Sequence, residues 1–210
     1  KTENLRRIFE FYSNEPEIYL NRIQWREADV CDYNSILKAL SGVNTVYHCA
    51  AVVSLSNGTE ELIQINVQGT ANLVNASLEQ KVNRFCFVSS IAACGHSTEK
   101  QTPIDEDTPL TNIENRSAYA QSKYYSEAEV WKGIQSGLNA VIVNPGVILG
   151  YSGTNRGSSE LFARVRKGLP FYTQGGSAYI DVRDVAKIMI LLTNTSIAGE
   201  RFILSAQNCS

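Results

Sequence analysis

Short apolar runs alternate with segments of helical periodicity along most of this chain of 210 residues. The strand-like runs fall at residues 23–30, 45–49, 84–89, 139–144 and 201–204, and the helical periods at residues 5–12, 33–40, 62–80, 118–136, 159–167 and 182–192. Strands that are apolar along their whole length are buried on both faces, as in parallel sheets. Right-handed crossovers then place helices on both faces. The sequence therefore predicts an α/β fold with a doubly wound, Rossmann-like parallel sheet.

Composition narrows the class of protein further. Apolar residues make up 43% and charged residues 19%, with a formal net charge of −2, which excludes a disordered chain and argues against a nucleic-acid partner. No apolar run reaches the ~18 residues that a membrane span needs. No secretory leader is visible and the five cysteines form no CxxC pair, so we expect a cytoplasmic protein with free thiols.

The two histidines, His48 and His96, give little support to a metal site. His48 lies in an apolar strand, and we interpret it as a hydrogen-bonded core histidine. We therefore predict that the protein binds no metal.

Ligands of doubly wound sheets bind beyond the carboxyl ends of the strands. The residues that follow expected strands are Ala50 and Ala51, Ser89 and Ser90, and Pro145 and Gly146. These positions are where we expect a binding site, and the long polar loop at residues 95–117 is of a length that is often functional.

Tyr119 and Lys123 lie four residues apart and share one face of an expected helix. An ammonium beside a phenol lowers the phenol's pKa and suits it to proton transfer with an alcohol or carbonyl oxygen. Ser90, at a strand end, can hydrogen-bond the same substrate oxygen. The alternative is that Tyr119 and Lys123 are surface residues and that Ser90 caps a turn.

Six ordered segments resemble those of the extended short-chain dehydrogenase/reductases, the NAD-dependent epimerase/dehydratase superfamily. They are VYHCAA at residues 46–51, NVQGT at 66–70, FVSS at 87–90, YAQSK at 119–123, NPG at 144–146 and DVRDVA at 181–186. The resemblance covers residues 28–204. The last motif looks most like the dihydroflavonol-reductase and 3β-hydroxysteroid-dehydrogenase branches.

The resemblance implies a role for each matching residue. Tyr119 is expected as general acid/base, Lys123 as the group that holds the nicotinamide ribose and lowers the pKa of Tyr119, and Ser90 as the group that orients the substrate oxygen. The expected contacts of an NAD or NADP cofactor also include Asp29 and Val30 at the adenine, Ala50, Ala51 and Asn66 along its length, and Pro145, Gly146 and Val147 at the nicotinamide, with a serine at 158 or 159 as a further contact.

The chain departs from the family pattern at its start. The expected first strand and its glycine turn, whose amides hold the pyrophosphate, are not found, so the choice between NAD and NADP stays open. We expect residues 1–150 to be an N-terminally incomplete dinucleotide-binding domain. Residues 151–210 are expected to contribute to a substrate region and to return to the Rossmann sheet.

The sequence predicts an oxidoreductase that transfers hydride between NAD or NADP and a carbonyl or hydroxyl carbon of a small-molecule substrate. Two alternatives stay open: a sugar-nucleotide epimerase or dehydratase, and a dinucleotide-binding or sensing protein without catalysis. A homodimer through the helices that carry Asn66 and Tyr119 is also left open.

Overall fold

A computed structural model describes residues 2–53, 59–95, 104–150, 165–168 and 176–209 of the chain. The strands are β1 (Thr45–His48), β2 (Arg84–Val88), β3 (Ala140–Pro145), β4 (Val147–Leu149), β5 (Ser177–Asp181), β6 (Glu200–Leu204) and β7 (Gln207–Cys209). The α-helices are α1 (Thr2–Glu10), α2 (Pro16–Leu20), α3 (Tyr33–Ala39), α4 (Thr59–Leu62), α5 (Gly69–Glu79), α6 (Ala118–Gln135) and α8 (Val182–Thr193). A π-helix, η1 (Ile63–Gln68), and two 3-10 turns, η2 (Ile91–Ala93) and η3 (Ile113–Asn115), complete the described elements.

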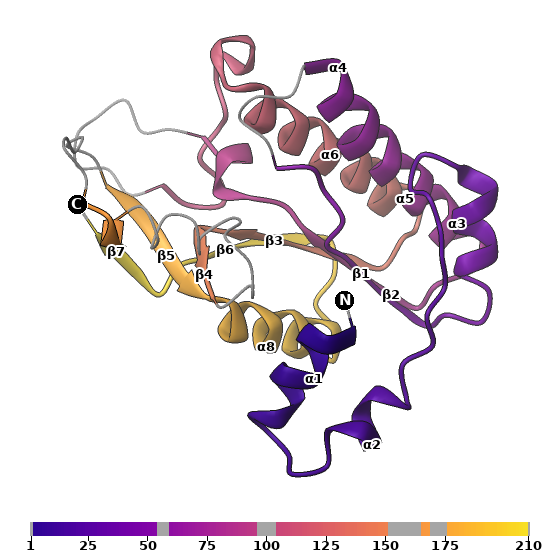
Figure 1. The fold of residues 1–210 in the computed structure, drawn as a ribbon. Coiled ribbons are helices and arrows are strands. Elements are labelled where there is room, and N and C mark those ends of the chain that lie inside the picture. Colours follow the sequence, from indigo (N-terminus) through magenta and orange to yellow (C-terminus); the bar gives the residue numbers. More distant parts are fainter. Residues whose placement is uncertain (1, 54–58, 96–103, 151–164, 169–175, 210) are drawn as a thin grey trace.

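The larger sheet has the strand order β1-β2-β3-β6, and all of its described pairs are parallel. Helices α3, α5 and α6 cover one face and α8 covers the other (Figure 1). This arrangement is the Rossmann-like α/β fold that the alternating pattern predicts, because parallel strands need crossovers and the crossovers place helices on the faces.

Each face of the sheet buries its own apolar cluster. Phe85, Phe87 and Ile142 point from β2 and β3 toward α5 and α6. Cys86 and Val141, the alternate residues of the same strands, point toward α8. Because successive side chains of a strand face opposite sides, a run that is apolar throughout supplies both clusters.

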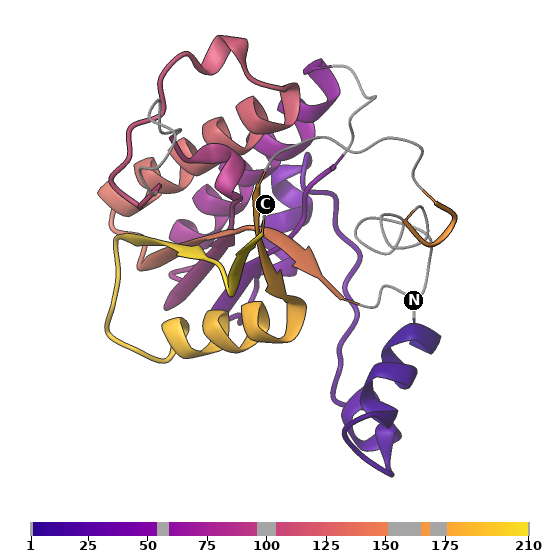
Figure 2. The same ribbon diagram turned by 90° about the vertical axis from the view of Figure 1, so that its left-hand side faces the viewer.

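A second, smaller sheet has the order β4-β5-β7, with β4 parallel and β7 antiparallel to β5 (Figure 2). Strand β4 begins two residues after β3 ends, so this sheet lies at the carboxyl end of the larger one. Asp181 ends β5 and caps α8, with its carboxylate accepting a hydrogen bond of 2.7 Å from the backbone N–H of Arg183.

The local structure differs from the expected elements at residues 23–30 and within residues 62–80. Residues 23–30 form no strand, because no described strand lies beside them to provide backbone hydrogen bonds. The expected helix at 62–80 is interrupted by η1, which places Asn66 in a π-helical turn. The helix expected at 159–167 falls largely outside the described residues, as do the serines at 158 and 159.

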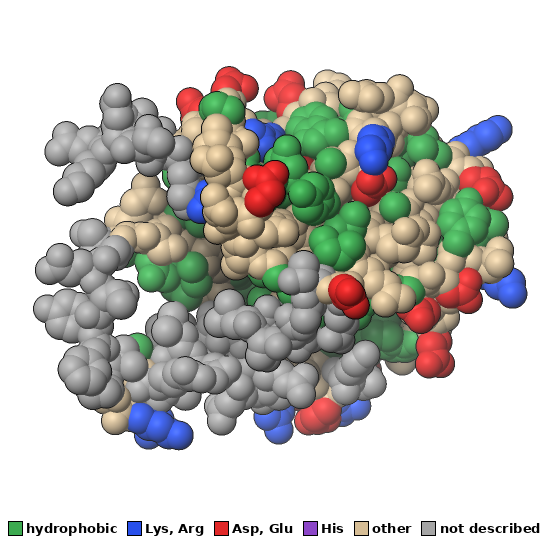
Figure 3. All heavy atoms as spheres, turned by 90° about the horizontal axis from the view of Figure 1, so that it is seen from above, with side chains coloured by type: hydrophobic (Ala, Val, Ile, Leu, Met, Phe, Trp, Pro, Cys, Tyr) green, Lys and Arg blue, Asp and Glu red, His purple; other side chains and the backbone are tan. Residues whose placement is uncertain are grey.

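The face seen in Figure 3 carries acidic and basic side chains interspersed with apolar ones. This mixture agrees with the near-neutral net charge of the chain. Among the described helices, none is long and apolar enough to cross a bilayer.

Candidate active site

A pocket of about 450 Å³ lies where β1, β2 and β3 end and where α6 begins. Its lining residues are Cys49, Ala51, Val53, Val88, Ser89, Ser90, Ile91, Tyr119, Lys123, Pro145, Gly146, Val147 and Ile148. Seven of the eleven residues expected to act at the site therefore meet in this pocket: Ala51, Ser90, Tyr119, Lys123, Pro145, Gly146 and Val147. The other four, Asp29, Val30, Ala50 and Asn66, do not line it.

Ser90 follows β2 in an extended conformation and begins the 3-10 turn η2. Its hydroxyl oxygen accepts a hydrogen bond of 3.1 Å from the backbone N–H of Ala92. The Ser90 side chain also interacts with the phenol of Tyr119, and this interaction lowers the pKa of Tyr119. Ser90 thus caps a turn, as the structural interpretation of the sequence suggested, whereas its hydrogen bond to a substrate oxygen stays a prediction.

Tyr119 lies in the first turn of α6, which Ser117 caps by accepting a hydrogen bond of 3.2 Å from the N–H of Ala120. Burial raises the pKa of the Tyr119 phenol above its ordinary value, and the hydrogen bond from Ser90 opposes that rise. The sequence-based expectation that this pKa is lowered is therefore wrong for the chain as it stands.

Lys123 explains the difference. Its ammonium donates a hydrogen bond of 2.7 Å to the carbonyl of Val88 and lies 4.8 Å from the centre of the Phe87 ring. The side chain is buried, and this burial lowers the pKa of Lys123 to about 8. The ammonium is thus anchored to the end of β2.

Asn66 is buried and its amide is turned away from the pocket. The side-chain oxygen accepts a hydrogen bond of 2.8 Å from the N–H of Val52. The side-chain nitrogen donates one hydrogen bond of 3.0 Å to the Val52 carbonyl and another of 3.0 Å to the hydroxyl of Ser122. Asn66 therefore fixes the segment after β1 against α6. Ala51 of that segment enters the pocket, whereas Ala50 is exposed outside it.

Asp29 and Val30 lie before α3, away from the pocket. The Asp29 carboxylate is exposed and accepts a hydrogen bond of 2.9 Å from the N–H of Cys31. Val30 packs so closely on Gly69 that a Cβ there would lie 2.9 Å from a Val30 methyl group. The two residues form a turn that is docked on the start of α5.

Pro145, Gly146 and Val147 join β3 to β4 and form one wall of the pocket. The N–H of Gly146 donates 3.0 Å to the carbonyl of Leu204, which continues the pairing of β3 with β6. A Cβ on Gly146 would overlap the carbonyl oxygen of Ala178 in β5. Glycine is therefore required here by the close approach of the smaller sheet.

His48 is the core histidine that its apolar strand suggested. Its Nε2 lies 2.9 Å from the hydroxyl of Thr70, and burial lowers the pKa of His48 to about 3. Within the described ranges, no group of histidine, cysteine, aspartate or glutamate side chains is arranged to hold a metal ion.

Several pocket residues were not expected from the sequence. Five of them line the pocket mainly with apolar side chains, and the Cys49 thiol is their one polar side-chain group: Cys49, Val53, Val88, Ile91 and Ile148. Cys49 and Val88 lie within the matched motifs, and Val53, Ile91 and Ile148 follow a motif by one or two positions, so counting each motif in full and extending it by two residues would have found all five. A further buried residue, Glu127, is four positions after Lys123, and that spacing is its only signal in the sequence.

Comparison with known proteins identifies the family of this chain. Residues 3–204 match the model of the "NAD dependent epimerase/dehydratase family". The chain therefore belongs to the NAD-dependent epimerase/dehydratase family, a family of enzymes, as the ordered motifs indicated.

Two curated relatives and one solved structure illustrate the similarity. The chain is 29% identical over 191 residues to cinnamoyl-CoA reductase 1 of Petunia hybrida, covering 87% of this chain and 57% of that protein. It is 32% identical over 196 residues to a putative dihydroflavonol 4-reductase of Synechocystis sp., covering 90% of this chain and 56% of that protein. The crystal structure of gox2253 superposes with a TM-score of 0.83 at 28% identity, covering 98% of this chain and 66% of that one. The chain spans little more than half the length of these curated relatives.

Proposed function

We propose that this chain carries the catalytic groups of an NAD(P)-dependent oxidoreductase acting on a carbonyl or hydroxyl carbon of a small-molecule substrate. The observation that carries the proposal is the meeting of Ser90, Tyr119 and Lys123 in one pocket, where Ser90 lowers the pKa of the Tyr119 phenol. The names of the two relatives, both reductases, support oxidoreduction over epimerisation.

The pocket suits the nicotinamide riboside of such a cofactor. Pro145, Gly146 and Val147 offer a wall of small and apolar groups to a planar ring. The Lys123 ammonium has three N–H donors and gives one to Val88, which leaves donors for ribose hydroxyls. When bound, the nicotinamide supplies or accepts the hydride. We propose that the adenine end of the cofactor lies toward the turn of Asp29 and Val30.

The side chains of this chain handle the proton. In the reduction, Ser90 and Tyr119 donate hydrogen bonds to the substrate carbonyl oxygen. Tyr119 then transfers its phenolic proton to that oxygen as hydride reaches the carbon, so that one C–H and one O–H bond replace the carbonyl π bond. Ser90 has a single hydroxyl proton, and in this step that proton is directed to the substrate oxygen.

The raised pKa of Tyr119 suits this direction of reaction. A buried phenol is protonated at neutral pH and can act as the acid in carbonyl reduction. Alcohol oxidation requires the phenolate instead, so its rate should increase with pH. We therefore propose reduction as the reaction that this site favours near neutral pH.

The roles of the two segments of the chain are also part of this proposal. We propose that residues 1–150 contribute the dinucleotide-binding part and residues 151–210 part of the substrate region. In support, β5 of the later segment packs against Gly146 in the pocket wall, while β6 joins the larger sheet. The homodimer through the helices of Asn66 and Tyr119 remains a prediction.

The test uses the intact protein with NADH or NADPH and three substrates: cinnamoyl-CoA, a dihydroflavonol and a nucleotide sugar. We expect reduction of a carbonyl substrate by the natural protein, and a loss of kcat by about 100- to 10,000-fold in Tyr119→Phe, as for removal of a general acid. Cofactor affinity, measured by fluorescence titration, should stay within about threefold because Phe keeps the ring.

The matched control is Tyr125→Phe, which removes a phenol hydroxyl from an exposed position of the same helix. It should leave kcat unchanged. Retained turnover in Tyr119→Phe with cofactor bound would contradict the mechanism. Turnover of the nucleotide sugar alone would replace the proposed function with epimerisation or dehydration, and cofactor binding without any turnover would favour a sensing role.

A further inference from the structure

Helix α6 presents a third polar group on the face that carries Tyr119 and Lys123. Glu127 follows Lys123 by four residues and therefore lies one turn further along the same face. It is only 3% exposed, and a buried carboxylate needs hydrogen-bond donors to offset its loss of hydration. The structure supplies four of them, two to each oxygen.

One carboxylate oxygen of Glu127 joins the ends of two strands. Oε2 accepts a hydrogen bond of 2.7 Å from the hydroxyl of Ser89 and another of 2.9 Å from the side-chain nitrogen of Asn144. Ser89 immediately precedes Ser90, and Asn144 immediately precedes Pro145. The Asn144 nitrogen also donates 3.0 Å to the backbone carbonyl of Ser90. Both strand ends are thus tied to α6 directly behind the pocket.

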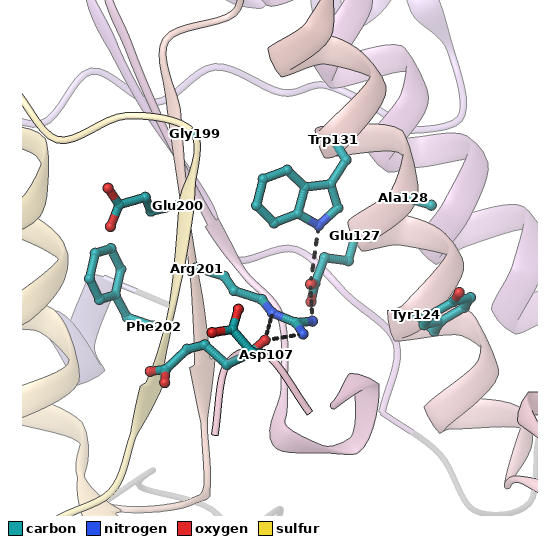
Figure 4. A pocket seen from close by; sticks show the side chains of 10 residues that line it. Asp107, Tyr124, Glu127, Ala128, Trp131, Gly199, Glu200, Arg201 and Phe202 are labelled. Atoms are coloured by element: carbon teal, nitrogen blue, oxygen red, sulfur yellow. Dashed lines mark hydrogen bonds and ion pairs between the residues drawn. The ribbon is translucent and has the colours of Figure 1, made fainter. Parts of the chain in front are cut away.

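The other oxygen is held from the opposite side. Oε1 accepts a hydrogen bond of 3.0 Å from a guanidinium nitrogen of Arg201 in β6 and another of 3.3 Å from the indole nitrogen of Trp131 (Figure 4). Arg201 is itself fixed, since its Nε donates 2.8 Å to the carbonyl of Glu106. Arg201 and Trp131 therefore restrain the carboxylate in the orientation that faces Ser89 and Asn144.

We propose that Glu127 is a positioning residue for the oxidoreductase site, which sets Ser90 against Tyr119 by joining α6 to the ends of β2 and β3. The inference rests on the proposed function, because a misplaced Ser90 would no longer act on the Tyr119 phenol or reach the substrate oxygen. A carboxylate is the group best suited to this position. All four neighbours are donors, whereas the amide of a glutamine would direct its own N–H groups at two of them.

The test compares Glu127→Gln with Glu129→Gln in the intact protein. Glu129 lies on the same helix and loses only its ion pair of 2.6 Å with Lys132, so it controls for the loss of one charge. Three quantities are measured: hydrogen exchange of the peptides covering residues 88–94 and 143–148, kcat and KM for the carbonyl substrate, and the pH profile of alcohol oxidation.

For Glu127→Gln we expect exchange in both peptides to accelerate by about tenfold or more, since the two strand ends lose their shared anchor. We expect kcat to fall by about tenfold or more with KM within about threefold, because the lost contact acts in the transition state. The apparent pKa of the oxidation profile should rise, because the Ser90 hydrogen bond lowers the pKa of Tyr119. A role confined to stability would leave that pKa unmoved.

Should Glu127→Gln fail to fold, Ser89→Ala takes its place, because it removes a single hydrogen-bond donor to the carboxylate. It should change hydrogen exchange, kcat and the pH profile in the same directions but by smaller amounts. Unchanged exchange, kcat and pH profile in a folded Glu127 or Ser89 variant would overturn the inference. The proposed function fails separately, if the natural protein turns over no carbonyl or alcohol. In that case the exchange measurement still decides whether Glu127 holds the strand ends.

Discussion

The hydroxyl of Ser90 links the turn after β2 to Tyr119: its oxygen accepts a hydrogen bond of 3.1 Å from the N–H of Ala92, and its interaction with the phenol lowers the pKa of Tyr119. The turn after β2 therefore orients the hydroxyl before any substrate binds. This orientation reduces the reorganisation that the site needs for proton transfer.

Substitution Ser90→Ala should lower kcat for carbonyl reduction by about 100-fold, the usual effect of removing one oriented donor. It should also raise the pKa of Tyr119, because Ser90 stabilises the phenolate. Alcohol oxidation, which needs the phenolate, should then shift to higher pH, as measured by kcat/KM across pH 6–10. Ser136→Ala, at the exposed end of α6, is the control and should change neither quantity. An unshifted oxidation profile in Ser90→Ala would show that this hydrogen bond does not tune Tyr119.

Substitution Lys123→Met should leave the protein as stable or more stable at pH 7 while weakening cofactor binding. Burial lowers the pKa of Lys123 to about 8 from an ordinary value of 10.5, so the folded state disfavours the charge. The free-energy cost of burying the Lys123 ammonium is fully present below pH 8, where lysine is protonated in both the folded and the unfolded state. This cost declines as the pH rises toward 10.5. The loss of the hydrogen bond to Val88 offsets part of the gain.

Denaturant unfolding at pH 7 and pH 10 measures this effect. The stability difference between Lys123→Met and the natural protein should become less favourable to the variant at pH 10. If the difference were the same at both pH values, the ammonium would not be carrying the burial cost.

Substitution His48→Gln should reduce the acid sensitivity of folding. The pKa of His48 falls to about 3 on folding from 6.5, so only the unfolded state takes up the proton between these values. The contribution of His48 to the free energy of unfolding is therefore fully present above pH 6.5 and is lost as the pH falls toward 3. Between pH 7 and pH 4 this one group accounts for about 3 kcal/mol, which the glutamine variant should not lose. Parallel unfolding curves for the two proteins across this range would contradict the assignment.

Substitution Gly146→Ala should destabilise the fold by about 1–3 kcal/mol, because the added methyl group overlaps the carbonyl of Ala178 and overpacks the junction. The strain separates β5 from the pocket wall, so affinity for NADH or NADPH should fall as well. Thermal unfolding and fluorescence titration measure the two effects. A melting temperature equal to that of the natural protein would mean that β5 moves aside without cost.

Much of this arrangement could be read from local patterns. Residues 33–40 show a helical period with Asp32 before it and Gly42 after it, and the structure has Asp32 capping α3 with Gly42 at a positive φ of 74°. The alternation of apolar runs predicted the parallel sheet, since burial of both faces leaves its mark on every residue of a strand. Residues 23–30 were misread because strand-forming side chains do not provide the neighbouring strand that a ladder requires.

The sequence alone determined the fold class, the strand ends that form the pocket, and the spacing that puts Tyr119, Lys123 and Glu127 on one face. These follow from the fixed periods of helices and strands. Only the tertiary structure decided that Asn66 faces Val52 rather than the pocket, that the Lys123 ammonium binds Val88, and that burial raises the pKa of Tyr119. Hydrogen-bond partners and hydration depend on how elements distant in the sequence pack, and no local spacing records that packing.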